Sequence, residues 1–240
     1  IDEAALNDAL ERITMGLTAA PLQDSAKKRL IAYHEIGHAL ITTLLPAADR
    51  LDKVTLLPRA GGVGGFARTM PDEEVLDSGL ISKAYLQARL VVAMGGRAAE
   101  LVVFGPSEIT QGASGDLELV SRIGREMVTR YGFSPLGPQA FEAEGAEVFL
   151  GRDWLRSEPA YSQETGNRID AQVQQLARHA LEQAVALLEP RRPLIDALVE
   201  ALIEQETIEG AAFSAIVERF EAVGGGPSAE ADVEAAQVGL

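Results

Sequence analysis

The residues best suited to chemistry are two histidines four positions apart, His34 and His38, with Glu35 directly after the first. On an α-helix, four residues turn the chain by about 400° and advance it by about 6 Å, so both imidazoles project from one face. Imidazoles placed in this way can bind one Zn²⁺ through ring nitrogens. The glutamate then has the position of a general base in zinc-dependent hydrolysis. Two ordinary helix histidines are the alternative, but the full pattern arises by chance in only about one per cent of chains.

The segment around this motif has the composition of a helix that packs against the rest of the chain. A helix is predicted for residues 25–45, with Ser25 as its N-cap and Pro46 just beyond its end. Apolar residues flank the motif and provide a face that can be buried: Ile31, Leu40, Ile41, Leu44 and Leu45.

The composition is that of a folded, acidic protein without thiol chemistry. Of its 240 residues, 47% are hydrophobic, which is enough to form a sizeable core. The net charge of −15 argues against nucleic-acid binding through a broad cationic surface. There is no cysteine, so the ligands of a metal site must be histidine and carboxylate. No apolar run reaches 18 residues, so we expect no membrane-spanning helix within this sequence.

The sequence predicts a mainly α-helical fold with one small β element. It starts without Met or a signal peptide, and an amphipathic helix at 2–16 resembles the end of an upstream module, so we expect a fragment of a longer protein. The predicted organisation is a remnant and linker at 1–20, a functional domain at 21–222 and a disordered tail at 223–240. Further helices are expected at 80–103 with a bend near Gly95 and Gly96, after the loop 110–116 as far as about residue 131, and at 162–189, 193–204 and 210–222.

The β element is expected as strands near residues 53–58 and 66–70, joined by a glycine-rich turn at 61–65. These glycines are not a phosphate loop, because no Lys-Ser/Thr follows and no helix opens after them. They serve either as a tight turn or as the approach to an exposed edge strand, to which an extended peptide can add by backbone hydrogen bonds. The candidate substrate-binding residues are then Gly64, Gly65, Phe66 and Ala67. Brief strands are also expected around Phe141 and at 148–150.

A catalytic zinc needs a third protein ligand, and two carboxylates are the leading candidates. No third histidine follows six residues after His38, and His179, on a long charged helix, is better explained as a surface or packing residue. Glu100 is a charged residue within an apolar helix. It can bind the metal or form an ion pair with a basic residue. It can also accept a hydrogen bond from the second ring nitrogen of a metal-binding histidine. Asp116 follows a run of small residues, where it can bind the metal or stabilise a helix start. Local chemistry leaves this choice open.

Several motifs, taken in order, resemble those of the peptidase domain of the FtsH family. The members of this family are membrane-anchored AAA+ zinc metalloproteases. The similarity runs from about residue 5 to about residue 222, and residues 16–18 and 24–30 are similar to the cyanobacterial and plastid branch. The motifs are His-Glu-Ile-Gly-His at 34–38, Gly-Gly-Arg-Ala-Ala-Glu at 95–100, Thr-Gln-Gly-Ala-Ser-Gly-Asp at 110–116 and Met-Val-Thr-Arg-Tyr-Gly-Phe-Ser at 127–134.

This resemblance implies a helical zinc metallopeptidase domain in which His34, His38 and Asp116 bind the metal and Glu35 is the base. It moves Glu100 to a supporting position behind a ligand, and it makes residues 62–69 the substrate-binding edge strand. Gly115 stands where the family commonly has a polar residue such as Asn, a departure that removes no ligand.

The resemblance also implies the setting of the domain. It predicts a homo- or hetero-hexameric ring that acts on unfolded or membrane proteins, with no nucleic-acid partner. ATP would act only in an ATPase module missing from these residues, and missing N-terminal segments would provide the membrane anchor. The domain itself would be soluble, on the cytoplasmic or stromal side of a plasma or thylakoid membrane. The competing hypothesis is a non-catalytic ring-assembly module with a structural zinc, although the sequence offers no convincing fourth ligand.

Overall fold

The computed structural model describes residues 26–58, 64–71, 77, 79–141 and 161–223. The helix predicted at 2–16, the strand predicted at 148–150 and the tail from residue 224 lie outside the described residues. Helices predominate, with one small antiparallel sheet, so the predicted fold class is confirmed. The elements are α2 (Ala26–Leu44), β1 (Arg50–Thr55), β2 (Phe66–Met70), α4 (Lys83–Ala93), α5 (Gly95–Phe104), η1 (Gln111–Ala113), α6 (Ser114–Thr129), α7 (Gln163–Leu188), η2 (Glu189–Arg191), α8 (Arg192–Gln205), β3 (Thr207–Glu209) and α9 (Gly210–Ala222).

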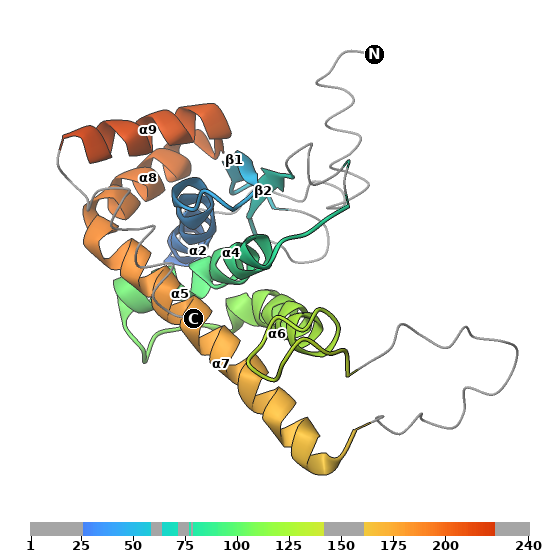
Figure 1. Cartoon of the computed structure of the whole chain (residues 1–240). Helices are drawn as coiled ribbons and strands as arrows, with labels where there is room; N and C mark the ends of the chain where they lie inside the picture. The colour runs from blue at the N-terminus through green and yellow to red at the C-terminus, as the bar shows by residue number, and fades with distance from the viewer. Residues whose placement is uncertain (1–25, 59–63, 72–76, 78, 142–160, 224–240) are drawn as a thin grey trace, which may run out of the picture.

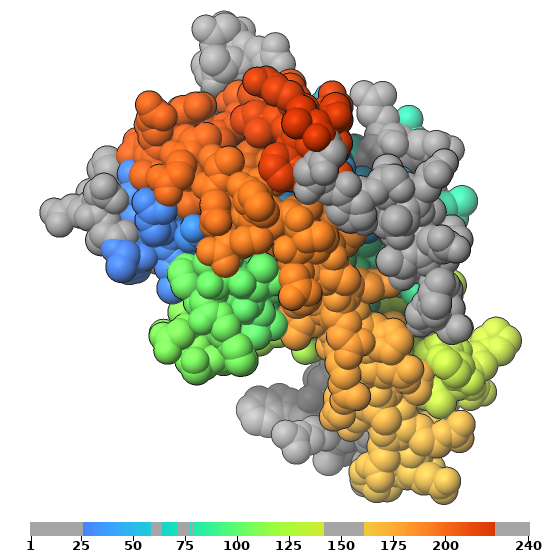
Figure 2. Space-filling model, turned by 90° about the vertical axis from the view of Figure 1, so that its left-hand side faces the viewer, coloured from blue at the N-terminus to red at the C-terminus, as the bar shows by residue number. Residues whose placement is uncertain are grey.

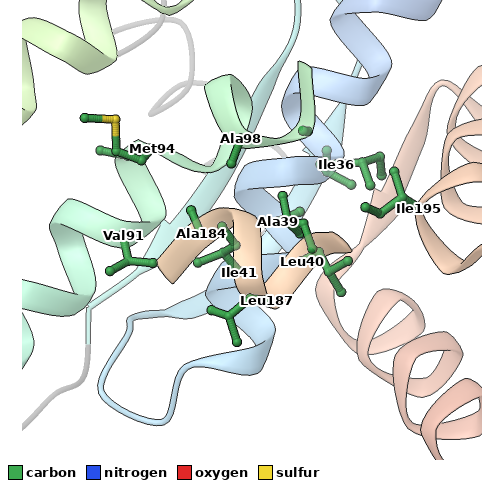
Figure 3. Packing of buried hydrophobic residues seen from close by; sticks show 14 of the residues in the cluster. Ile36, Ala39, Leu40, Ile41, Val91, Met94, Ala98, Ala184, Leu187 and Ile195 are labelled. Carbon is green, nitrogen blue, oxygen red and sulfur yellow. The ribbon is translucent and has the colours of Figure 1, made fainter. Parts of the chain in front are cut away.

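The histidine-bearing helix α2 is the centre of the fold. It packs against α5, α8, α4, α7 and the sheet, and Figure 1 shows it enclosed by these elements. Its side chains Ile36, Leu40 and Ile41 are fully buried, whereas Ile31, Leu44 and Leu45, also predicted for the buried face, are half-buried against the core. In the close view of the core (Figure 3) the fully buried side chains lie among side chains from α5, α7 and α8, with the labelled residues including Ile36, Leu40, Ile41, Ala98, Ala184, Leu187 and Ile195. Burial of each large aliphatic side chain contributes about 1.5–3 kcal/mol, so this packing holds the motif helix in place.

Two glycines let α2 and α5 approach each other at backbone distance. A Cβ atom on Gly37 would lie 2.3 Å from the carbonyl oxygen of Gly95, and a Cβ on Gly95 would lie 2.8 Å from that of Gly37. The region predicted as one bent helix over 80–103 forms two helices, α4 and α5, which meet at Met94. The interruption allows α5 to start in a new direction, with its glycines against α2.

The sheet has the strand order β2-β1-β3, with β2 and β3 both antiparallel to β1. Strand β2 has the predicted limits, whereas β1 begins and ends three residues earlier than the predicted 53–58. Pro58 has no N–H to contribute to a ladder, and the N–H of Leu56 already donates to the carbonyl of Glu206 at 2.8 Å. Strand β3, which supplies the other partner of β1, was not predicted.

The predicted helices in the second half of the chain are confirmed as α7, α8 and α9, and Figure 2 shows them in orange and red across one face. Arg191, only 1% exposed, joins the end of α7 to α9 because its guanidinium donates to Leu187 O at 2.9 Å and to Glu221 at 2.8 Å. Phe141 itself is not in the predicted strand, since its N–H donates to Thr129 O, at the end of α6, and the residues after it lie outside the described ranges. Within the described ranges, no helix has the length and apolar character needed to cross a membrane.

Candidate metal centre and active site

His34 and His38 project from one face of α2 and meet Asp116, which comes from the first turn of α6. The Nε2 atoms of the two histidines lie 3.2 Å apart. Oδ2 of Asp116 lies 3.2 Å from Nε2 of His34 and 3.5 Å from Nε2 of His38. Among the residues that the structure describes, only these three side chains form a cluster able to hold a metal ion, and His179 lies outside it.

The spacing of the three donor atoms matches ligands arranged around a tetrahedral zinc. Zinc lies about 2.0–2.1 Å from histidine nitrogens and carboxylate oxygens, so two ligand atoms of one tetrahedron are about 3.3 Å apart. The observed separations of 3.2, 3.2 and 3.5 Å bracket this value. The donor set therefore fits Zn²⁺, and with three described protein ligands a fourth position is left for water or substrate.

Each histidine is oriented by a hydrogen bond at its other ring nitrogen. Nδ1 of His38 lies 2.7 Å from the carbonyl oxygen of Val92, an acceptor, so this nitrogen must carry the proton. Nδ1 of His34 lies 2.9 Å from Oε1 of Glu100, a fully buried carboxylate. Both Nε2 atoms are thereby directed toward the metal position.

Glu100 also holds the loop that leads to Asp116. Its carboxylate accepts hydrogen bonds from the N–H of Thr110 at 2.6 Å and from the hydroxyl of Thr110 at 3.2 Å. Arg97 donates to the carbonyl of the same threonine at 3.1 Å. Of the two candidate third ligands, the structure thus places Asp116 beside the Nε2 atoms and Glu100 behind His34, where one carboxylate orients both a histidine and the loop.

Helix α5 passes so close to His34 that only glycine fits at position 96. A Cβ atom on Gly96 would lie 2.3 Å from Cε1 and 2.4 Å from Nε2 of the His34 ring. The second glycine of the pair at 95–96 is thus in direct contact with the candidate metal ligand.

The histidines and carboxylates of the site stabilise one another's charged forms. Burial by itself lowers the pKa of His34, but hydrogen bonds to Asp116 and Glu100 outweigh it and raise this pKa to about 10. Burial acts to raise the pKa of Asp116, and the contacts with His34 and His38 outweigh it and hold that pKa below its usual range. Because an imidazole must be neutral at the nitrogen that binds a metal, a metal ion at Nε2 of His34 competes with a proton there.

Glu35 borders the same cavity as the three donors. Burial raises the pKa of Glu35, and the opposing effects of the two histidines and of a backbone hydrogen bond from Ala67 do not cancel this rise. A carboxylate with a raised pKa takes up a proton more readily, as general acid–base catalysis requires.

The cavity beside the donors has a volume of about 380 Å³ and is bordered by the edge strand β2. Gly65, Phe66 and Ala67 of the predicted substrate segment line it, together with Thr69. Gly64 instead packs toward Ile31, since a Cβ on it would lie 2.5 Å from Cδ1 of that side chain.

Other residues that line this cavity were not singled out from the sequence. Thr42 stands four residues after His38, so helical spacing was the signal that could have found it. Arg89 and Leu119 come from α4 and α6, and nothing in their local sequence indicates that they face the motif helix.

Comparison with known proteins bears on this site. The family model described as Peptidase family M41 matches residues 21–216, which is most of the chain and includes every donor of the cluster. The chain belongs to peptidase family M41. The M41 match starts ahead of α2 and ends within α9, so it covers all the elements that build the site.

Relatives of this M41 chain include proteins named ATP-dependent zinc metalloprotease FtsH, which confirms the predicted resemblance. One from Trieres chinensis is 40% identical over 221 residues, FtsH 3 of Synechocystis sp. is 43% identical over 206, and the chloroplastic FTSH 1 of Arabidopsis thaliana is 39% identical over 218. These matches cover 92%, 85% and 90% of this chain but 34%, 33% and 30% of the relatives. The chain therefore spans about a third of the length of the curated relatives it matches.

Proposed function

We propose that this chain is the zinc-dependent endopeptidase domain of an ATP-dependent protease, with residues 21–222 forming the peptidase unit. The observation that carries the proposal is the arrangement of His34, His38 and Asp116 at tetrahedral ligand spacing, with Glu35 on the wall of the adjoining cavity. Membership of family M41 supports the reaction class.

His34, His38 and Asp116 would hold the metal through Nε2, Nε2 and Oδ2. When bound there, Zn²⁺ supplies Lewis-acid polarisation of the scissile carbonyl and activation of a water molecule. Glu35 accepts a proton from the attacking water on its carboxylate and later delivers it to the leaving amide nitrogen. Glu100 keeps the His34 ring in the orientation that presents Nε2.

The substrate would be an extended, unfolded polypeptide segment. Strand β2 lies at the edge of the sheet and borders the cavity, so an added peptide strand would run past Glu35. Gly65, Phe66 and Ala67 are the proposed contact residues, and Gly64 allows the approach to β2 to pack closely on α2. A peptide bound in this way needs a free backbone, which folded proteins do not offer.

For the full-length protein we propose the assembly that its relatives' family suggests. This is a homo- or hetero-hexameric ring, anchored in a plasma or thylakoid membrane by other segments, with the peptidase domain on the cytoplasmic or stromal side. An ATPase module elsewhere in that protein would deliver unfolded or membrane-protein substrates.

The test of the active site combines zinc content with hydrolysis of an unfolded, casein-like substrate. The parent chain is expected to hold about one zinc and to cleave. Glu35→Gln is expected to keep the zinc and to lose about 10²–10⁴-fold in turnover, because it can no longer take up the proton. Asp116→Asn is expected to lose zinc and activity together, whereas the control Glu118→Gln, an exposed position on the same helix, should match the parent.

Three outcomes would contradict this proposal. Parent-like cleavage by Glu35→Gln would remove the assigned base. Retention of zinc and activity by Asp116→Asn would make Glu100 the ligand to test. A parent chain that holds zinc but cleaves nothing would favour the non-catalytic module with a structural metal.

A further inference from the structure

The cavity beside the donors extends well beyond them along α2. His34, His38 and Thr42 line it at four-residue spacing, so it follows one face of the helix from the donors toward the C-terminal end. A volume of about 380 Å³ exceeds what one water and a scissile bond need, and lies in the range of ligand pockets. The part farther from the donors is therefore available to a substrate side chain.

Part of the cavity wall is apolar. Val92 and Ala93 come from α4, Leu119 from α6 and Phe66 from β2. Such walls favour the aliphatic stem of a substrate side chain, because its burial removes apolar surface from water.

One wall also carries a cation that has no anionic partner among the described residues. Arg89 lines the cavity and is half-buried, and it forms no ion pair or hydrogen bond with the described residues. Its guanidinium contacts the ring of Tyr85, whose centroid lies 5.9 Å from the guanidinium carbon. In a chain with 36 acidic and 21 basic residues, a half-buried arginine without an anionic partner in the described part of the chain stands out.

The acidic residue on the same wall is already engaged. Asp49 also lines the cavity, and its Oδ1 accepts a hydrogen bond from the hydroxyl of Tyr85 at 2.8 Å. Tyr85 therefore contacts both charged residues of this wall, Asp49 through its hydroxyl and Arg89 through its ring. The N–H groups of Arg89 have no protein acceptor among the described residues, and a planar guanidinium is matched best by a carboxylate.

We propose that this cavity is a specificity subsite for a substrate residue with an aliphatic stem and a carboxylate tip, namely glutamate, which Arg89 recognises. The inference rests on the proposed peptidase function, since it concerns which peptide bonds that site selects. Val92, Ala93 and Leu119 would contact the stem, and the guanidinium of Arg89 would donate to the two carboxylate oxygens.

The test uses the zinc-loaded chain and an unfolded peptide library whose cleavage sites are mapped by mass spectrometry. For the parent, glutamate should be enriched at one fixed position relative to the cleaved bond. Two quenched fluorescent peptides that differ only by Glu or Lys at that position then give a ratio of kcat/KM values. The parent is expected to favour the Glu peptide roughly tenfold or more, as loss of a hydrogen bond to a charged group implies.

Variants at Arg89 should change this ratio without abolishing hydrolysis. Arg89→Met is expected to bring the ratio close to one, and Arg89→Glu to invert it in favour of the Lys peptide. Arg89→Lys should keep the sign of the preference. Arg122→Met, which removes an exposed arginine from α6 outside the cavity, is the matched control and should keep the parent's ratio.

The outcomes separate the subsite from the peptidase function. If the parent and Arg89→Glu both cleave and share one cleavage map, the subsite is refuted while the peptidase function stands. If the zinc-loaded parent cleaves no peptide, the peptidase function itself fails.

Discussion

Replacement of Gly96 by alanine tests how the approach of α5 shapes the metal centre. The added Cβ would lie 2.3 Å from Cε1, 2.4 Å from Nε2 and 2.6 Å from Cδ2 of the His34 ring. Ordinary van der Waals contact begins near 3.4 Å, so the ring must move by about 1 Å. Metal–ligand distances tolerate only about 0.2 Å. His34 therefore cannot keep its position as a ligand in this variant.

Two physical effects of this substitution have opposite signs. Gly→Ala inside a helix ordinarily stabilises a protein by about 0.5–1 kcal/mol. Displacement of the ring instead breaks the hydrogen bond to Glu100 and leaves a buried carboxylate with one partner fewer, which costs about 1–3 kcal/mol. We expect zinc affinity to fall by at least about 10–100-fold, the range seen when only an outer hydrogen-bond partner is lost, because here the ligand itself moves.

The assay is a competition titration of zinc against a chromophoric chelator, with thermal unfolding of the metal-free chain alongside it. Gly115→Ala is the matched control, because it stands next to Asp116 and no atom lies within 4 Å of its added Cβ. The control should bind zinc as the parent does. Parent-like affinity in Gly96→Ala would refute the steric reasoning and would mean that α5 does not constrain the His34 ring.

Three further predictions concern the surroundings of the site. Glu100→Gln is expected to weaken zinc binding about 10–100-fold, because a neutral amide holds the N–H of His34 less strongly than a carboxylate does; unchanged affinity in the same titration would contradict this. Gly37→Ala is expected to lower the free energy of unfolding by about 1–3 kcal/mol, measured in urea, because its Cβ would meet the backbone of Gly95 at 2.3 Å. Burial and a hydrogen bond to a carboxylate raise the pKa of Tyr85 to about 12 from 10.0, so the neutral phenol stabilises the fold below pH 10 and this contribution is lost as the pH rises toward 12. Comparison of the phenolate absorbance of the parent with that of Tyr85→Phe measures this pKa, and an ordinary titration near pH 10 would contradict it.

The sequence alone was enough to locate the candidate site and most of the helices. The spacing of His34 and His38 determines their common face through the helical repeat, which depends only on neighbouring residues. Apolar periodicity and proline positions likewise defined α2, α7, α8 and α9 to within a few residues, because these signals are local. Strand β2 was predicted for the same reason.

Elements whose limits depend on partners were predicted less well. The limits of β1 follow from its pairing with β2 and with β3, and β3 is too short to show a pattern of its own. The 80–103 region divides into α4 and α5 where Gly95 contacts Gly37. These two glycines are 58 residues apart in the sequence. Such contacts have no signature within a short window of sequence.

Local sequence chemistry did not decide which carboxylate faces the histidines, and tertiary packing did. Local chemistry left both Glu100 and Asp116 open, and the family resemblance favoured Asp116. The two carboxylates lie 66 and 82 residues from His34. The crossing of α5 over α2 brings Glu100 to Nδ1, and the start of α6 brings Asp116 to Nε2. The position of Arg89 on the cavity wall was decided in the same way. Residue type and helical spacing thus determine what the site can do, whereas the packing of distant helices determines which side chains complete it, because a metal centre requires positions accurate to a few tenths of an ångström.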